Sequence, residues 1–128
     1  MSVREPVHTP EAPDAIGPYS QAVLYGDVLF CSGQIPLDAA TGELVSGTLG
    51  EETTRCLENL EAVCQAANTT LARALRLTVY TTQLEAFAEI NEAYAVFFPD
   101  EAPARAAVGV AALPKGARVE VDAIVAVE

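Results

Sequence analysis

The chain has 128 residues, of which 51% are hydrophobic and 20% are charged, a balance typical of one folded domain spanning residues 1–128. Seven basic against eighteen acidic residues give a net charge of −11, which disfavours binding to the phosphate backbone of a nucleic acid. Three cysteines without a CxxC pair argue against a disulfide framework, and a single histidine, His8, argues against a zinc site. The chain has no apolar run of ~20 residues, which argues against a membrane span. Together these features favour a soluble, cytoplasmic protein.

The beginning of the chain predicts an extended arm followed by a β-hairpin. Residues 1–16 contain three prolines and show no hydrophobic period, so we expect an extended N-terminal arm. Residues 19–25 and 28–34 are two strand candidates, separated by Gly26-Asp27. A two-residue loop with glycine first is typical of a type II′ hairpin.

A helix is expected after the turn-rich stretch of residues 35–47. Thr48 with Glu51 three positions later forms a capping-box pattern, which predicts the helix N-terminus. Apolar residues then recur on one helical face, and Asn68 is expected to end the helix. The residues of this face are Cys56, Leu57, Leu60, Val63, Cys64 and Ala67.

The second half of the chain predicts a strand, a helix and two more strands. Residues 75–82 are β-branched and alternating, and the apolar spacing over residues 87–98 predicts a second amphipathic helix that Pro99 ends. The final strands are expected over residues 105–112 and 117–127. The resulting order, β-β-α-β-α-β-β, predicts an α+β fold: a mixed sheet with both helices on one face.

The final strands leave no clean polar side, so the second face of the sheet is expected to be apolar as well. A large exposed apolar surface is typical of association between copies. The pattern therefore predicts a homo-oligomer without fixing the number of subunits. The residues behind this expectation are Val108, Val110, Val119, Val121, Ile124 and Val125.

Two charges in these apolar strands, Arg105 and Glu120, are candidate functional groups. Arg105 suits either an ordinary surface salt bridge or a two-point hydrogen bond to a carboxylate, and the residues alone leave both open. Glu120 shares a face with Asp122, which favours a solvated acidic face, although a half-buried carboxylate can also orient a water. No catalytic triad or glycine-rich phosphate loop accompanies them.

Three further candidates lie nearer the N-terminus. Gly33 stands at the end of a strand, where a glycine often marks a bulge or the close approach of a ligand. Ser32 is an ordinary hydroxyl on residue type alone, and Tyr19 could belong to the core or form the wall of a pocket. Cys31, like the two helix cysteines, is expected to be a buried, unreactive thiol.

Motifs spread over nearly the whole chain resemble those of the RidA/YjgF family of enamine and imine deaminases. Each motif is weak alone, but together they occur in the family's order and spacing. They are AIGPYSQA at 15–22, SGQIPLD at 32–38, TGELV at 41–45, LENL at 57–60, PAR at 103–105, LPKG at 113–116 and VEV at 119–121.

The resemblance implies a chorismate-mutase-like fold assembled as a homotrimer, with sites in the clefts between subunits and no metal or organic cofactor. It implies a 2-iminobutanoate/2-iminopropanoate deaminase. Such an enzyme hydrolyses 2-aminoacrylate and related 2-imino acids, released by pyridoxal-phosphate dehydratases, to 2-oxo acids and ammonia. The family's arginine falls on Arg105, its glutamate on Glu120, its tyrosine on Tyr19, and its serine-glycine pair on Ser32 and Gly33.

In this interpretation Arg105 clamps the substrate carboxylate and Glu120 holds the attacking water, while backbone groups near Gly33 and Ala107 orient the substrate and Tyr19 closes the cleft. The chain departs from the family after Arg105. Ala106 and Ala107 stand where members often carry a small hydroxyl residue and then a cysteine or alanine, and Gly109 stands where many carry an acid. We therefore expect activity with an altered substrate preference.

The spacing of the two charges raises a geometric question. In a plain hairpin centred near Lys115, Glu120 would lie opposite Val110, ~16 Å along the ladder from Arg105. One subunit could not then place both groups on one small substrate. Either they meet across a subunit interface or the last two strands are not a plain hairpin.

Two other functions remain open. A non-catalytic trimeric module that binds 2-oxo acids or similar carboxylates would use Arg105 and leave Glu120 incidental. Nucleic-acid cleavage or translation inhibition, attributed to some relatives, is disfavoured by the charge of −11, the lack of a basic stripe and the absence of histidine from the candidate site.

Overall fold

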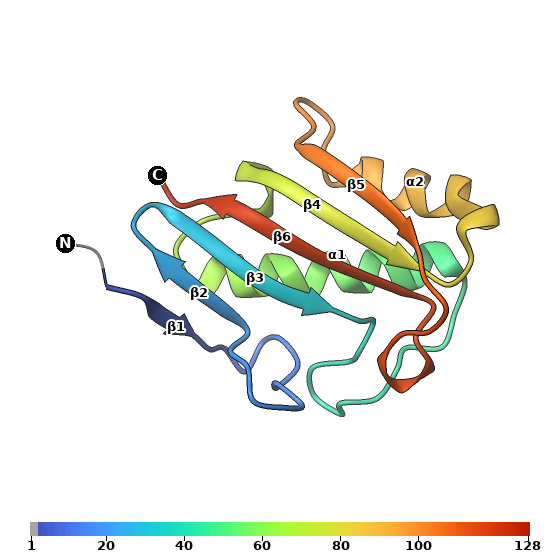
Figure 1. Ribbon diagram of the computed structural model, residues 1–128, viewed down its shortest axis with the longest axis horizontal. Coiled ribbons are helices and arrows are strands. Elements are labelled where there is room, and N and C mark those ends of the chain that lie inside the picture. Colours follow the sequence, from blue (N-terminus) through green and yellow to red (C-terminus); the bar gives the residue numbers. More distant parts are fainter. Residues whose placement is uncertain (1–2) are drawn as a thin grey trace.

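Residues 3–128, which the computed structural model describes, form one six-stranded mixed sheet with two α-helices on one face (Figure 1). The strand order is β1-β2-β3-β6-β4-β5, and every neighbouring pair is antiparallel except β4 with β5. The strands are β1 (Glu5–Val7), β2 (Ala22–Tyr25), β3 (Val28–Gln34), β4 (Ala74–Thr81), β5 (Ala104–Gly109) and β6 (Val119–Ala126), and the helices are α1 (Leu49–Ala66) and α2 (Phe87–Val96). The expected α+β architecture is confirmed.

The N-terminal segment contains a short strand that the sequence pattern did not predict. Glu5 to Val7 form β1, which pairs with β2 at the edge of the sheet. Pro6 tolerates this position because an edge strand leaves one side of its backbone unpaired. Residues 1–2 of the expected arm lie outside the described residues. The β2–β3 hairpin is as expected: Tyr25 pairs with Val28, and Gly26 has a φ of +63°, as a type II′ turn requires at that position.

The capping signals of α1 are confirmed in detail. The Thr48 hydroxyl accepts a hydrogen bond from the Glu51 N–H (3.1 Å), and the Glu51 carboxylate accepts one from the Thr48 N–H (2.8 Å). Asn68, two residues past the end of the helix, has a φ of +61°, the left-handed conformation that stops helices. The sequence therefore determines both ends of this helix locally.

The core lies between the sheet and the helices. Leu57, Leu60 and Val63 of α1 are fully buried. So are Val79 of β4 and Val121 of β6, which belong to the same core cluster. Within the described part of the chain, all three cysteines are buried and unpaired, as expected from the apolar pattern around them. None of the helices in residues 3–128 is long and apolar enough to cross a membrane.

The last two strands do not pair with each other, so the alternative that they are not a plain hairpin is confirmed. β4 lies between β5 and β6, running parallel to β5 and antiparallel to β6. The segment β4–α2–β5 is a strand–helix–strand crossover, which places its two strands side by side in parallel. Residues 110–118, including the 3₁₀ turn Pro114–Gly116, then carry the chain past β4 to β6.

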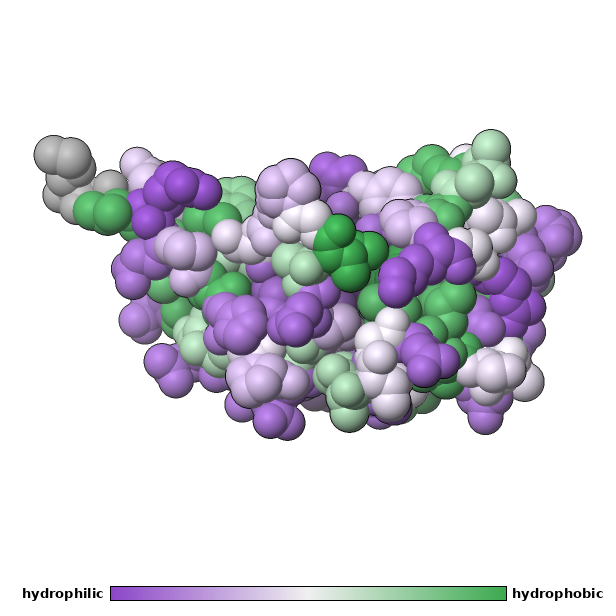
Figure 2. Space-filling view, turned by 90° about the horizontal axis from the view of Figure 1, so that it is seen from below, coloured by the Kyte–Doolittle hydropathy of each residue, from purple (hydrophilic) through white to green (hydrophobic). Residues whose placement is uncertain are grey.

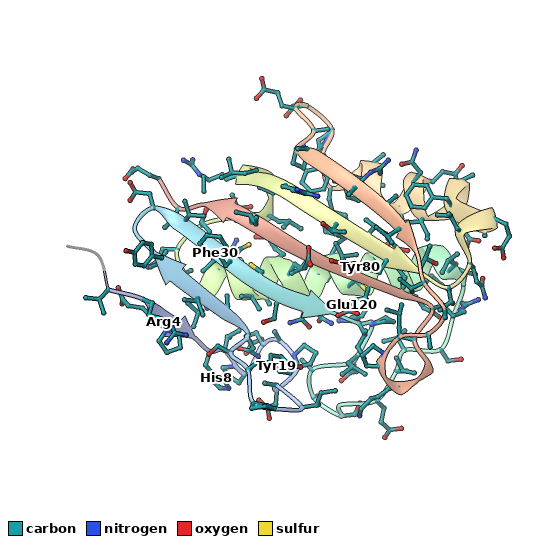
Figure 3. All side chains as sticks on the ribbon, in the orientation of Figure 1. Arg4, His8, Tyr19, Phe30, Tyr80 and Glu120 are labelled. Carbon is teal, nitrogen blue, oxygen red and sulfur yellow. The ribbon has the colours of Figure 1, made fainter. Side chains whose placement is uncertain are left out.

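The sheet face turned away from the helices, hereafter the open face, is mixed rather than uniformly apolar. β6 alternates strictly: Val119 and Val121 point to the helices, while Glu120 and Asp122 point to the open face. Phe30 is 47% exposed and, like Tyr80 and Glu120, lies on the viewer's side of the sheet in Figure 3. The expected association between copies stays a prediction.

Candidate functional site

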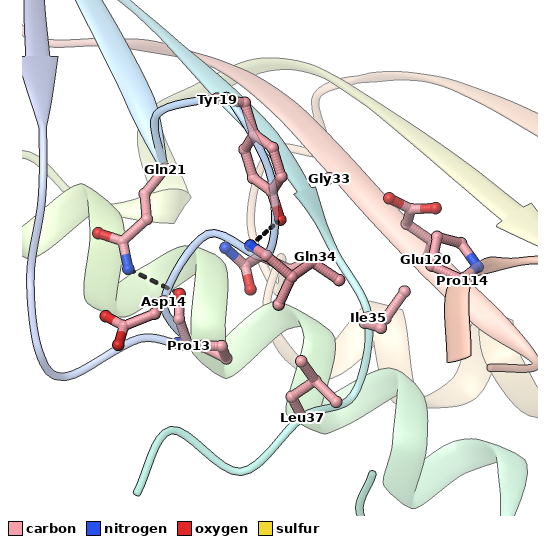
Figure 4. Close-up of a pocket in the computed structure, with 11 residues that line it drawn as sticks. Pro13, Asp14, Tyr19, Gln21, Gly33, Gln34, Ile35, Leu37, Pro114 and Glu120 are labelled. Atoms are coloured by element: carbon pink, nitrogen blue, oxygen red, sulfur yellow. Dashed lines mark hydrogen bonds between the residues drawn. The ribbon is translucent and has the colours of Figure 1, made fainter. Parts of the chain in front are cut away.

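Glu120 faces a shallow pocket beside the end of β3 (Figure 4). Tyr19 from the loop before β2, Gly33 from β3 and Glu120 from β6 line it, with apolar surface from Ile35 and Leu37. The pocket is a shallow recess, with about 40 Å³ open to a water-sized molecule. Within one chain it therefore has room for a few waters only.

Gly33 allows the Glu120 carboxyl group to lie against β3. A Cβ at position 33 would lie 2.9 Å from Cδ and 3.2 Å from Cγ of Glu120, too close for any residue other than glycine unless the glutamate moved. The β3–β6 register also shifts between Cys31 and Gln34, so Gly33 lies in an irregular part of the strand. The expected strand irregularity is therefore present, and the group that approaches the glycine is the Glu120 side chain.

Glu120 holds its proton more tightly than an ordinary glutamate. It is half-buried, and loss of hydration raises its pKa, with the nearby Asp122 carboxylate adding to the effect. Asp122 itself accepts a hydrogen bond from the Tyr80 hydroxyl (3.0 Å), and Tyr80 lies opposite Glu120 in the β4–β6 register. A carboxyl group with a raised pKa is better suited than an ordinary glutamate to accept a proton from water and donate it again.

The pocket wall that carries Tyr19 is fixed by a buried glutamine. The Gln21 side chain accepts a hydrogen bond from the Thr9 N–H (2.7 Å) and donates to the carbonyl oxygens of Thr9 (3.1 Å) and Pro13 (2.7 Å). Tyr19 is 47% exposed, and its hydroxyl accepts a hydrogen bond from the Ile16 N–H (3.2 Å). Tyr19 therefore belongs to a pocket wall and not to the core.

Ser32 lies next to the pocket but does not line it. Its hydroxyl donates a hydrogen bond to the Ser20 carbonyl (2.6 Å), and its N–H donates to the Gln21 carbonyl (2.9 Å). These bonds join β3 to the segment that carries Tyr19. The geometry gives Ser32 a structural task in this chain.

Arg105 is exposed on the edge strand β5 and is held by side chains of α2. Its Nη1 donates a hydrogen bond to Asn91 Oδ1 (2.8 Å). The guanidinium carbon lies 4.7 Å from the ring centre of Tyr94 and 5.1 Å from that of Phe87. None of the ion pairs formed by residues 3–128 involves Arg105, so the surface salt bridge considered for it is absent there.

Arg105 and Glu120 point to opposite faces of the sheet. Arg105 is the register partner of Leu77, whose side chain is buried on the helix side, whereas Glu120 is the partner of Tyr80 on the open face. Leu77 and Tyr80 are separated by roughly 10 Å along β4, and β5 and β6 by about 10 Å across it. One chain therefore cannot bring both groups to one small substrate.

The remaining predicted site residue, Ala107, groups with Arg105. It is exposed on β5 and is the register partner of Val79, on the helix side of the sheet. The structure thus divides the predicted residues in two. Tyr19, Gly33 and Glu120 share a pocket with Ser32 beside it, and Arg105 and Ala107 lie together elsewhere.

Sequence reasoning missed Asn91 and the aromatic surroundings of Arg105. Phe87, Asn91 and Tyr94 have i, i+4, i+7 spacing, so they form one stripe along α2. That spacing was the available signal, but the apolar pattern over residues 87–98, which includes Phe87 and Tyr94, predicts only an amphipathic helix. The crossover that brings β5 under this stripe was not predictable from local pattern.

Seen from below in Figure 2, hydrophilic side chains dominate the surface of the molecule and hydrophobic ones are scattered among them. Within residues 3–128, no group of three or more His, Cys, Asp or Glu side chains is arranged to hold a metal ion.

Comparison with known proteins places these residues in context. A family model described as Endoribonuclease L-PSP matches residues 9–127. The RutC family protein y4sK of Sinorhizobium fredii is 50% identical over 121 residues, covering 94% of this chain and 96% of that protein. The human 2-iminobutanoate/2-iminopropanoate deaminase is 43% identical over 122 residues, covering 95% of this chain and 89% of that protein.

A solved structure from Thermotoga maritima, described as a putative endoribonuclease, superposes with a TM-score of 0.94 at 48% identity. The match covers 97% of this chain and 98% of that one.

Proposed function

Because this chain belongs to the Endoribonuclease L-PSP family, also known as RidA/YjgF, we propose that it hydrolyses 2-imino acids to 2-oxo acids and ammonia. Its substrates would be 2-iminobutanoate, 2-iminopropanoate and the enamine 2-aminoacrylate. The observation that carries the proposal is a half-buried glutamate with a raised pKa in a surface pocket, together with an arginine that pairs with no carboxylate among residues 3–128.

The active site is proposed to form between copies of the chain, with Arg105 and Ala107 from one subunit and Tyr19, Gly33 and Glu120 from its neighbour. The opposite orientation of the two charges supports this arrangement. None of the ion pairs of residues 3–128 neutralises Glu120 or Asp122 on the open face, so covering that face favours a cation from a partner. The homotrimer expected for the family closes such a head-to-tail arrangement.

Each group then has a defined task. Arg105 binds the substrate carboxylate through two parallel N–H···O bonds. Glu120 takes a proton from a water as the water oxygen bonds to the carbon of the protonated imine and the C=N π electrons move to nitrogen, giving a neutral carbinolamine. The proton then passes from Glu120 to the nitrogen. The C–N bond breaks as the hydroxyl proton returns to Glu120, which passes it to the departing ammonia, so the 2-oxo acid and ammonium leave. Tyr19 and the pocket walls exclude other water from the reacting carbon.

The alanines after Arg105 leave this part of the site without hydroxyl or thiol groups. Ala107 can contribute only backbone and a methyl group, and a Cβ at position 109 would lie 3.2 Å from Leu84 Cδ2. An acid at 109, common in the family, would therefore press on Leu84. We propose that the smaller groups widen the site and shift preference toward larger imines such as 2-iminobutanoate.

The protein is proposed to act in the cytoplasm beside pyridoxal-phosphate dehydratases, which release such imines, and to limit the damage that these cause. The direct test generates 2-iminobutanoate with a threonine dehydratase and follows its decay with and without the purified protein. We expect clear acceleration. No acceleration over buffer, together with binding of a 2-oxo acid, would instead support the non-catalytic carboxylate-binding module.

Ribonuclease activity, which the family description names, has less support in this chain. The net charge is −11, and His8 is exposed, pairs with Asp14 at 3.4 Å and does not line the pocket. Salt-dependent RNA binding at micromolar protein would reopen that alternative.

A further inference from the structure

The environment of Arg105 is chemically unusual for an arginine in a chain with eighteen acidic residues. Its contacts are the faces of two aromatic rings and the oxygen of a neutral amide, on one stripe of α2. A carboxylate in this place would have neutralised the guanidinium. Aromatic faces and an amide hold the group while leaving its full charge available to a ligand.

We propose that Phe87 and Tyr94 are positioning residues that fix the guanidinium plane of Arg105, so that its remaining N–H groups meet a planar carboxylate. The inference rests on the proposed function. In it, the two rings hold Arg105 in the orientation that binds the carboxylate group of the substrate. Phe87 is half-buried and Tyr94 is 5% exposed, so both rings are themselves held by packing. Asn91 lies between them on the helix. Its Oδ1 accepts a hydrogen bond from one guanidinium N–H of Arg105 and so limits the rotation of the guanidinium group.

The alternative is that the rings are only core residues that Arg105 happens to cover. Two features separate the alternatives. The core does not require the guanidinium, because Arg105 is exposed on an edge strand and its stem alone could cover Phe87. A planar group over a ring also resists rotation, which an ammonium in the same place would not. A positioning role therefore depends on the guanidinium, and a packing role does not.

The test is a double-mutant cycle on the intact protein, with Phe87→Leu and Arg105→Lys separately and together. Phe87→Leu is expected to raise KM for 2-iminobutanoate about two- to fivefold and leave kcat unchanged. The reason is that the arginine–carboxylate contact holds the substrate and the transition state equally, so weakening it changes only binding. In the Arg105→Lys background the same change is expected to have no effect on KM. An equal effect in both backgrounds, or a fall in kcat with unchanged KM, would overturn the proposal.

Tyr94 supplies the matched control. Its hydroxyl has no hydrogen-bond partner among residues 3–128, so Tyr94→Phe keeps the ring and should keep KM, whereas Tyr94→Leu should raise it as Phe87→Leu does. Melting temperatures identify variants that fail to fold. If Tyr94→Leu fails to fold, Phe87→Leu alone carries the test. Wild-type protein without deaminase activity would contradict the proposed function. Active wild type with ring variants of unchanged KM would contradict only the positioning role.

Discussion

The two charged groups of the proposed site occupy opposite environments in the same sheet. Arg105 is exposed on the edge strand β5 and is held by neutral groups, so its charge stays available. Glu120 is half-buried on β6, with its carboxyl group over Gly33 and a second carboxylate, Asp122, nearby. The first environment suits ionic binding of a substrate, and the second suits repeated proton transfer.

The difference indicates how one chain could carry both charged groups of the proposed site without the two neutralising each other. Arg105 and Glu120 in contact within a subunit would form an ion pair, which lowers the pKa of the carboxyl group and removes the charge of the clamp. Their placement on opposite faces keeps them apart until copies associate. The following predictions test each environment separately.

Glu120→Gln is expected to give the largest effect. The amide keeps the shape of the side chain but cannot accept the proton of the attacking water, so kcat should fall about 100- to 10,000-fold. Binding of 2-oxobutanoate, measured by calorimetry, should be retained because Arg105 remains. A variant that loses ligand binding along with kcat would contradict the division of tasks.

Asn91→Asp is expected to damage the arginine side specifically. An aspartate at the position of the 2.8 Å Arg105–Asn91 contact would pair with the guanidinium and compete with the substrate carboxylate. KM should rise about tenfold while kcat stays near the wild-type value. Asn91→Ala, the control, leaves the charge unpaired and should raise KM less. A larger effect from alanine would mean that Asn91 serves packing instead.

Asp122→Asn is expected to give the smallest effect, a shift in pH dependence. Burial is the larger cause of the raised Glu120 pKa and Asp122 the smaller, so removing the Asp122 charge should move the acidic limb of kcat to lower pH without restoring an ordinary glutamate value. Tyr80→Phe removes the hydrogen bond from the Tyr80 hydroxyl to Asp122 but keeps the Asp122 charge. The acidic limb of kcat in this variant should therefore stay nearer that of the wild type. Identical profiles for Asp122→Asn and wild type would contradict this coupling.

Stability should follow the same pKa with a defined sign. The folded-state pKa of Glu120 lies above its unfolded value, so its contribution to folding is fully present below the unfolded pKa and is lost as pH rises through the folded pKa. Asp122→Asn should lose less stability than the wild type over that window. Urea unfolding at a series of pH values measures the difference.

Local chemistry explains which parts of the fold were predictable. The capping box of Thr48 and Glu51, the left-handed stop at Asn68 and the Gly26-Asp27 turn are short-range signals, and the structure contains all three. The pairing of β5 with β4 depends on how α2 packs, which is a long-range interaction. No local sequence pattern indicated whether β5 would pair with β4 or with β6.

The same distinction applies to the site. Tyr19, Gly33 and Glu120 lie in motif segments, and the structure brings them into one pocket. The face on which Arg105 lies depends on its pairing with Leu77, so alternation along β5 alone could not supply it. Asn91 lies on the exposed side of α2, and its spacing from Phe87 and Tyr94 could be given a role only once the fold had placed Arg105 beside it.

The central claim is that an Arg105 from one subunit and a Glu120 from its neighbour form each site. Its most direct test mixes inactive Arg105→Ala and Glu120→Gln chains by co-expression and measures imine hydrolysis by the purified hetero-oligomers. In a closed trimeric ring that contains both variants, one of the three sites has both groups intact, so we expect the hetero-oligomers to show about one third of the wild-type activity. Hetero-oligomers no more active than the two parent variants would contradict the claim.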